Sequence, residues 1–296
     1  RNYGNHDLLF GASIKNNLYD DNTIATQSVV NGTIINKNSN QLIPGLLIQD
    51  QYKPSEKISI IGGLRADHFN EHGFIYAPSF HIKYNPGDWL SLRLNAGTGF
   101  RLVNLFTEDH AFITGQREVK ILEELKPEQS KSLIFNANYI YTGLNGSGNI
   151  DLDIFYNYFS NKIIPNYDNK NFIIYGNSDG YAYSKGISGA LNHTFLNGIA
   201  FSLTFNHQIV RYTEVENNKE NFFDMEHSPK WTGTFNLKVP INKKWSINSS
   251  SNYVGVMQLP TVFEMKDNGE ISSVARPTKS KPFSTHNINI NGILNN

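Results

Sequence analysis

The residue types best suited to binding a small molecule lie close together in one polar stretch of the chain. This stretch mixes charged side chains, an imidazole and an aromatic ring, a combination that can bind a ligand through ion pairs, hydrogen bonds and stacking. Binding residues are often found in long loops carried by a rigid scaffold, although a charged loop is usually just solvated. The candidate ligand-binding residues are Arg101, Glu108, His110, Phe112, Arg117 and Glu118.

A second stretch is rich in aromatic side chains and allows two interpretations. Its rings could stack on an aromatic or haem-like ligand, or they could anchor the chain at a membrane interface, where aromatic residues are enriched. The residues are Tyr167, Phe172, Tyr175 and Tyr181.

The sequence offers no arrangement typical of catalysis or metal binding. His68 and His72 would share a face only on a helix, whereas their surroundings predict a turn. The Gly97-Thr98-Gly99 segment lacks the third glycine and the following helix of a dinucleotide-binding motif. The chain has no cysteine, so it has no disulfide and no thiol nucleophile. We therefore predict no catalytic residue, no metal site and no cofactor.

The charge balance argues against a nucleic-acid partner. The chain carries 26 basic and 26 acidic residues, a formal net charge of zero. Nucleic-acid-binding domains are usually basic, because they must neutralise phosphates.

Most of the chain alternates apolar and polar residues in segments of about ten, the pattern of strands with two different faces. Between Leu90 and Ala96, for example, every second residue is apolar and the residues between them are polar. No segment has the pattern of an amphipathic helix. The pattern predicts about twelve strands, at residues 6 to 17, 43 to 53, 57 to 69, 74 to 84, 88 to 98, 130 to 142, 148 to 160, 184 to 196, 198 to 211, 230 to 239, 244 to 255 and 283 to 291.

The connections between these strands are of two kinds in strict alternation: one kind is short, and most of the other kind are long. In an antiparallel meander this order separates a turn side from a loop side. Aromatic residues gather near the strand ends, where rings can occupy membrane interfaces: Tyr84, Trp89, Tyr139, Tyr141, Trp231, Trp245 and Tyr253. Both features are typical of an all-β transmembrane barrel.

Several charged residues fall on the polar face of the predicted strands. An arginine that faced lipid at the middle of the membrane would cost about 2–4 kcal/mol, so this face must point toward the lumen. The residues are Arg65, Asp67, Arg93, Asp151 and Asp153.

A series of motifs, in order along nearly the whole chain, resembles one family. Residues 46–69 read LLIQDQYKPSEKISIIGGLRADHF, and Ala77-Pro78-Ser79-Phe80 follows; next come Gly97-Thr98-Gly99-Phe100-Arg101, residues 125–130 (LKPEQS) and residues 227–231 (HSPKW). Each motif alone is weak, but the ordered set is specific. It resembles the barrel of TonB-dependent outer-membrane receptors.

The resemblance implies a barrel of twenty-two strands, filled by an amino-terminal plug domain, in the outer membrane of a Gram-negative bacterium. Such receptors import scarce nutrients such as siderophores, cobalamin, haem or similar chelates, with energy from the TonB complex. Residues 1–296 would then be part of the barrel, with strands missing at both ends and no plug domain. The implied partners are the receptor's own plug, TonB, outer-membrane lipid and a small nutrient, and the five lumen residues would contact the plug. The short turns would be periplasmic and the long loops extracellular.

Two alternatives remain at this point. A secreted or surface β-sandwich that serves in binding or adhesion would be soluble without detergent. An outer-membrane barrel enzyme would need a catalytic group converging at the barrel wall, and no such spacing is recognisable.

Overall fold

The computed structural model describes residues 2–19, 27–30, 33–36, 39–102, 118–121, 125–166, 172–216, 219–260, 263–265, 271–275 and 279–292. Within these ranges the regular structure consists of strands, and no helix is long and apolar enough to cross a membrane.

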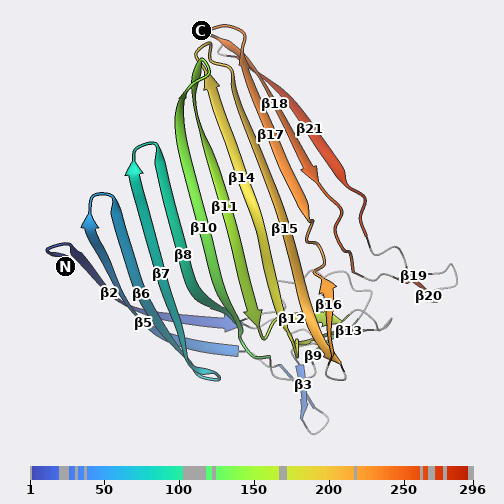
Figure 1. Cartoon of the computed structure of the whole chain (residues 1–296). Coiled ribbons are helices and arrows are strands. Elements are labelled where there is room, and N and C mark those ends of the chain that lie inside the picture. Colours follow the sequence, from blue (N-terminus) through green and yellow to red (C-terminus); the bar gives the residue numbers. More distant parts are fainter. Residues whose placement is uncertain are drawn as a thin grey trace.

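One antiparallel sheet dominates the molecule and forms a long curved wall (Figure 1). Along this sheet each long strand lies beside the long strands that precede and follow it in the chain. In spatial order its strands are β1 (Asn2–Tyr3), β2 (His6–Tyr19), β5 (Ser39–Ser55), β6 (Ile58–Phe69), β7 (Gly73–Gly87), β8 (Leu90–Arg101), β10 (Glu128–Gly143), β11 (Gly146–Ser160), β14 (Tyr181–Phe195), β15 (Ala200–Glu216), β17 (Trp231–Pro240), β18 (Trp245–Val254) and β21 (Phe283–Gly292).

All twelve predicted strands are confirmed, because each corresponds to one long strand from β2 to β21. The structure adds short strands within stretches that were predicted as connections. They are β3 (Gln27–Val30), β4 (Thr33–Asn36), β9 (Glu118–Ile121), β12 (Ile163–Asn166), β13 (Phe172–Asn177), β16 (Lys219–Asp224), β19 (Phe263–Met265) and β20 (Ile271–Ala275).

The predicted separation of turns from loops is also confirmed. Most tight turns lie at the upper end of the wall in Figure 1, and the short added strands lie around its lower end. Among the described residues, the exception is the connection between β6 and β7, residues 70–72, which is a tight turn at the lower end. The turn between β10 and β11 has two residues, Leu144 and Asn145, with φ of 50° and 57°. Two successive positive φ values are typical of the type I′ turn, whose twist matches that of a two-stranded ribbon.

The two faces of the wall differ in chemistry. Directly paired residues of neighbouring strands share a face, so the residues of each face can be read from the strand register. On β10 the outward-facing residues Leu133, Phe135, Ala137 and Tyr139 form an apolar band. Leu133 remains 49% exposed and Phe135 37% exposed. An apolar face left open to this extent is typical of a surface that contacts lipid.

Aromatic rings border this band at the turn end. Trp89 packs edge-on against Tyr139 with ring centroids 5.9 Å apart, and Tyr139 stacks beside Tyr141 at 6.2 Å. The predicted placement of aromatic residues near strand ends therefore holds for these three residues.

A small apolar core lies at the loop end rather than within the wall. Ile43, Phe69 and Ile75 are buried there, and Phe100 and Leu102 pack against them. This cluster fixes the loop-proximal ends of β5, β6, β7 and β8, where the candidate site begins.

Candidate functional site

The predicted ligand-binding residues are only partly covered by the structure. Glu108, His110, Phe112 and Arg117 lie outside the described residues. Arg101 is the last residue of β8, and Glu118 is the first residue of β9. The geometry of the site is therefore built from Arg101, β9 and the elements that they contact.

A small sheet covers the loop end of the wall beside β11 and β14 (Figure 1). Its strand order is β12, β13, β9, with β12 and β13 antiparallel and β13 and β9 parallel. Ile173 and Tyr175 alternate toward its buried side and are 4% and 2% exposed. We call these three strands the loop sheet. It places Glu118 opposite Phe172, so two loops that are distant in sequence meet here.

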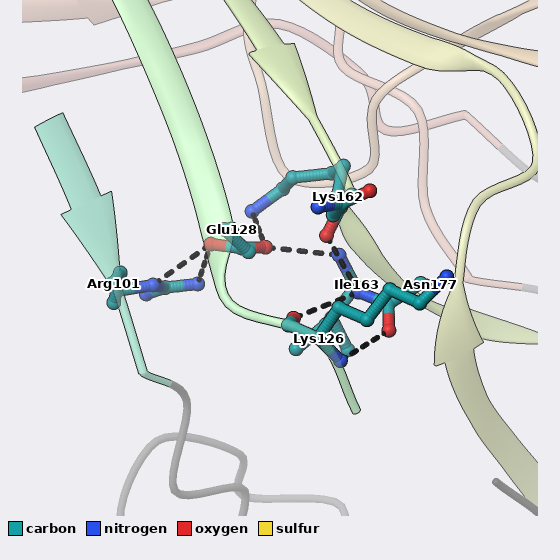
Figure 2. Close-up of polar contacts among 7 residues, drawn as sticks. Arg101, Lys126, Glu128, Lys162, Ile163 and Asn177 are labelled. Atoms are coloured by element: carbon teal, nitrogen blue, oxygen red, sulfur yellow. Dashed lines mark hydrogen bonds and ion pairs between the residues drawn. The ribbon is translucent and has the colours of Figure 1, made fainter. Parts of the chain in front are cut away.

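Glu128, the first residue of β10, joins the wall to the loop sheet. One carboxylate oxygen accepts a hydrogen bond from Arg101 Nε at 2.9 Å, and Arg101 Nη2 lies 2.8 Å from the same oxygen. The other oxygen accepts from Lys162 Nζ at 2.8 Å and from the backbone N–H of Ile163 at 2.9 Å. Figure 2 shows Arg101 and Lys162 approaching Glu128 from opposite sides.

The environment of Glu128 favours its charged form. Its side chain is 6% exposed, and it lies at the loop end of β10, beyond the apolar band that begins at Leu133. Burial raises the pKa of the carboxyl group, but hydrogen bonds from Lys162 and the Ile163 N–H, together with the charges of Lys162 and Arg101, outweigh burial. The pKa of Glu128 therefore lies below its ordinary value.

Asn177, at the end of β13, forms a second tie between the loop sheet and the wall. Its amide nitrogen donates to the carbonyl oxygens of Lys126 and Asn161, at 3.0 and 2.7 Å. Its amide oxygen accepts from the Lys126 backbone N–H at 2.7 Å. Asn161 has a φ of 54°, and asparagine tolerates this left-handed conformation better than most residues. The two ties hold the loop sheet against the start of β10.

The sequence did not indicate this arrangement. Arg101 was predicted as a ligand contact, whereas its guanidinium lies against Glu128 with the Arg101 side chain still 50% exposed. The pairing of Arg101 with Glu128 follows from the register of β8 and β10, in which these residues are directly opposite. Lys162 and Asn177 carried no recognisable signal, because Lys162 lies in the connection before β12 and Asn177 ends the short strand β13, and neither segment has an alternating pattern.

Among the aromatic candidates, the described residues have different environments. Tyr175 is almost fully buried in the loop sheet, and Tyr181 stacks on Tyr158 with centroids 5.3 Å apart. Tyr167 lies outside the described residues.

The charged residues of the polar face form local networks on the side opposite the apolar band. Arg65 binds Asp67 with two hydrogen bonds, Nε to Oδ2 at 2.6 Å and Nη2 to Oδ1 at 3.0 Å. Asp67 is 1% exposed. Arg93 pairs in register with Lys83 on one side and with Asn136 on the other.

The two acidic residues of β11 share amide partners. Asn136 donates to Asp151 at 2.9 Å and to Asp153 at 2.8 Å, and Asn138 donates to Asp151 at 2.7 Å. The polar face thus has a basic part around Lys83 and Arg93 and an acidic part on β11.

Comparison with known proteins assigns this architecture to a family. A family model described as a TonB dependent receptor-like β-barrel matches residues 1–292. This chain belongs to the TonB-dependent receptor β-barrel family. No curated protein shows a significant match.

Solved structures share the fold of this TonB-dependent barrel chain. The siderophore receptor PirA from Acinetobacter baumannii has a TM-score of 0.70 at 17% identity, with 96% of this chain and 45% of that chain covered. A variant of the ferric enterobactin receptor PfeA from Pseudomonas aeruginosa has a TM-score of 0.71 at 15% identity, with 98% and 44% covered. The FrpB iron transporter from Neisseria meningitidis has a TM-score of 0.59 at 18% identity, with 87% and 39% covered.

These matches fix the class of the protein. The chain spans less than half of the length of the first two receptors, and identities this low show the fold alone. The TonB-dependent receptor family consists of transporters rather than enzymes, so the barrel-enzyme alternative is set aside. The family match over residues 1–292 likewise sets aside the β-sandwich.

Proposed function

We propose that this chain forms part of the barrel wall of an outer-membrane receptor that imports a scarce nutrient in a Gram-negative bacterium. The observation that carries the proposal is a family match along nearly the whole chain, joined to a wall whose turns and loops are separated. The structural relatives are receptors for siderophores and a transporter for iron by name. An iron chelate such as a siderophore is therefore the first substrate class to test, with cobalamin and haem as the next candidates.

The proposed receptor includes a plug domain, further barrel strands and a TonB partner that lie outside this chain. A plug domain would fill the lumen, TonB would supply energy through the full-length protein, and the wall would continue toward the twenty-two strands expected from the resemblance. The short turns would face the periplasm, and the loop sheet would face the outside. In this orientation the nutrient would meet the loop sheet and the loop that carries His110 and Phe112 first.

Ligand contacts are proposed for Arg101, Glu108, His110, Phe112, Arg117 and Glu118. One arrangement supports this proposal: Arg101 contacts Glu128, which also binds Lys162 at the start of the loop sheet, and Glu118 is the first residue of β9 in that sheet. The Arg101 side chain is 50% exposed, and arginine is well suited to bind the anionic oxygens of a chelate.

The test uses the full-length receptor that contains this chain. A strain without the gene is grown under iron limitation with a panel of labelled ferric siderophores, and uptake is measured with and without TonB. We expect uptake of at least one chelate to require both the receptor and TonB. Replacing His110, Phe112 and Arg117 together with alanine should reduce binding of that chelate about tenfold or more, a loss of about 1.4 kcal/mol.

The matched control replaces Asp88, Lys243 and Lys244 with alanine, because these charged residues lie in turns at the opposite end of the wall. This variant should bind the chelate as the wild type does. Normal growth of the deletion strain on every chelate, cobalamin and haem would contradict the import proposal, and so would a receptor that fractionates with soluble protein.

A further inference from the structure

The outward face of the wall carries lysines and tyrosines together near the loop end. Lys131 pairs in register with Tyr158, and Tyr158 pairs with Tyr183, so the three side chains form one row across β10, β11 and β14. The next row toward the turns holds Tyr156 paired with Lys185. We call these five residues the basic aromatic patch. By the strand register, these five residues lie on the same face of the wall as the apolar band. The charged residues predicted to face the lumen lie on the opposite face.

The patch lies at the boundary of the apolar band. Lys131 and Tyr141 face the same side of β10 and are ten residues apart. This separation is about 33 Å along a strand and about 25 Å along the membrane normal when the strand is tilted by about 40–45°. The apolar band of outer-membrane barrels has about this height. If the aromatic residues around Tyr141 mark one interface, Lys131 therefore lies at the level of the opposite headgroups.

A tyrosine ring contacts one of the two lysines without neutralising its charge. Tyr156 and Tyr183 stack with ring centroids 6.4 Å apart and planes 15° from parallel. The Lys185 ammonium lies over the Tyr183 ring at 5.5 Å. Among the described residues, neither Lys131 nor Lys185 has a carboxylate within ion-pair distance.

The neighbouring charges are already paired. Arg211 follows Tyr183 in the same row, and its Nε lies 2.8 Å from Asp224. Lys230 Nζ also lies 2.8 Å from Asp224. Lys131 and Lys185 are therefore cations of this surface that have no carboxylate partner among the described residues.

A groove of about 470 Å³ opens beside Lys131. The ladder between β7 and β8 ends at the pair Ser79 and Gly97, while β8 continues to Arg101 beside β10. The groove lies at this point, and its lining includes Phe74, Tyr76, Phe100, Lys126, Lys131 and Tyr158. Apolar rings next to lysines suit a molecule that has both a hydrocarbon chain and an anionic headgroup.

We propose that the basic aromatic patch and this groove bind a phosphorylated lipid of the outer leaflet, with the phosphate at Lys131 and Lys185. The proposal rests on the proposed function, because it requires the wall to stand in a membrane with the loop end outward. Charge complementarity carries the assignment: two unpaired cations at headgroup depth favour an anionic lipid, and a lysine near a membrane surface adds attraction to such lipids. Tyrosine hydroxyls at the same level can donate hydrogen bonds to phosphate oxygens.

The experiment measures lipid binding by the purified full-length receptor in detergent, using native mass spectrometry with lipid A that carries two phosphates. Dephosphorylated lipid A is the paired probe. We expect the wild type to prefer the phosphorylated form, and Lys131→Gln with Lys185→Gln to lower its affinity about 30-fold. The variant Lys131→Arg with Lys185→Arg should retain binding, because it keeps both charges.

The matched control is Lys243→Gln with Lys244→Gln, which removes the same charge from a turn at the other end of the wall. It should bind phosphorylated lipid A as the wild type does. Equal binding of both lipid forms by the wild type would overturn the proposal, and so would unchanged affinity in the Lys131 and Lys185 variant. A heat-dependent shift in gel mobility would confirm that each variant is folded.

Failure of this inference can be told from failure of the proposed function. Chelate uptake and outer-membrane fractionation are measured on the same variants, and the glutamine variant should keep both. Loss of lipid binding with import intact supports the inference. A receptor that neither reaches the outer membrane nor imports any chelate contradicts the proposed function, whatever its affinity for lipid A.

Discussion

At the scale of single residues, Gly45 shows how closely the polar face is packed. A Cβ placed on Gly45 would collide with Oδ1 of Asp67 and would lie 2.9 Å from Oγ of Ser13. Asp67 cannot easily move away, because Arg65 holds both of its carboxylate oxygens. The absence of a side chain at position 45 therefore leaves room for the buried Asp67 carboxylate to pair with Arg65.

We predict that Gly45→Ala destabilises the barrel by about 1–3 kcal/mol, the usual cost of overpacking a closely packed site. Gly62→Ala is the control, because it lies on the neighbouring strand β6 and a Cβ there would meet nothing within 4 Å. The measurement is the urea midpoint of unfolding for both variants of the full-length receptor in detergent. Equal midpoints would show that the Arg65 and Asp67 pair tolerates displacement.

At the scale of elements, the loop sheet depends on a single carboxylate for much of its attachment. Glu128 belongs to the wall, while Lys162 and Ile163 belong to the segment that enters β12. Hydrogen bonds to a charged group contribute about 1.5–3 kcal/mol each, more than bonds between neutral groups. The loop sheet should therefore be held against the wall when Glu128 is ionised and be held less firmly when Glu128 is protonated.

We predict that acid weakens the docking of the loop sheet. The pKa of Glu128 is lower when the loop is docked than its ordinary value of 4.5, so the stabilisation is complete above that value and is lost as the pH falls through the lowered pKa. The measurement is the mobility of a nitroxide at Ile164→Cys, which is a unique label in this chain because the chain has no cysteine. Mobility should increase below pH 4.5 in the wild type.

The control for this prediction is Glu128→Gln, which cannot be ionised. Its nitroxide should be mobile at neutral pH and should respond little to acid. A steep pH response that persists in Glu128→Gln would assign the effect to another carboxylate.

At the scale of the whole molecule, the wall separates two kinds of surface. The apolar band on one side and the charged networks on the other require different environments, and the pairings of the described strands run from β1 to β21 without joining these ends. Under the proposed function, lipid covers the first surface and the plug covers the second. The acidic part of the polar face, Asp151 and Asp153, would then pair with basic groups of the plug.

We predict that Asp151→Asn with Asp153→Asn weakens the docking of the plug in the full-length receptor by about 1–3 kcal/mol, as expected for lost hydrogen bonds to charged groups. The measurement is the urea concentration at which a protease first cleaves the plug while the barrel stays folded. Asp88→Asn, an exposed turn residue, is the control. If both variants release the plug at the same urea concentration, the acidic pair has no role in plug contact.

The sequence by itself determined the twelve long strands, the separation of turns from loops and the polar side of residues such as Arg93 and Asp153. These features follow from local chemistry, because each strand must alternate residues for two different environments along its own length. A period of two can be read without knowing which strands are neighbours.

The tertiary structure alone decided how the candidate site is built. Lys162 reaches Glu128 across 34 positions in the sequence, and Asn177 reaches Lys126 across 51. The parallel pairing of β13 with β9 joins two separate loops and leaves no local pattern. Loop residues do not alternate between two environments as strand residues do, so no sequence pattern indicates their contacts. Their contacts depend on which segments the curved wall brings together at its loop end.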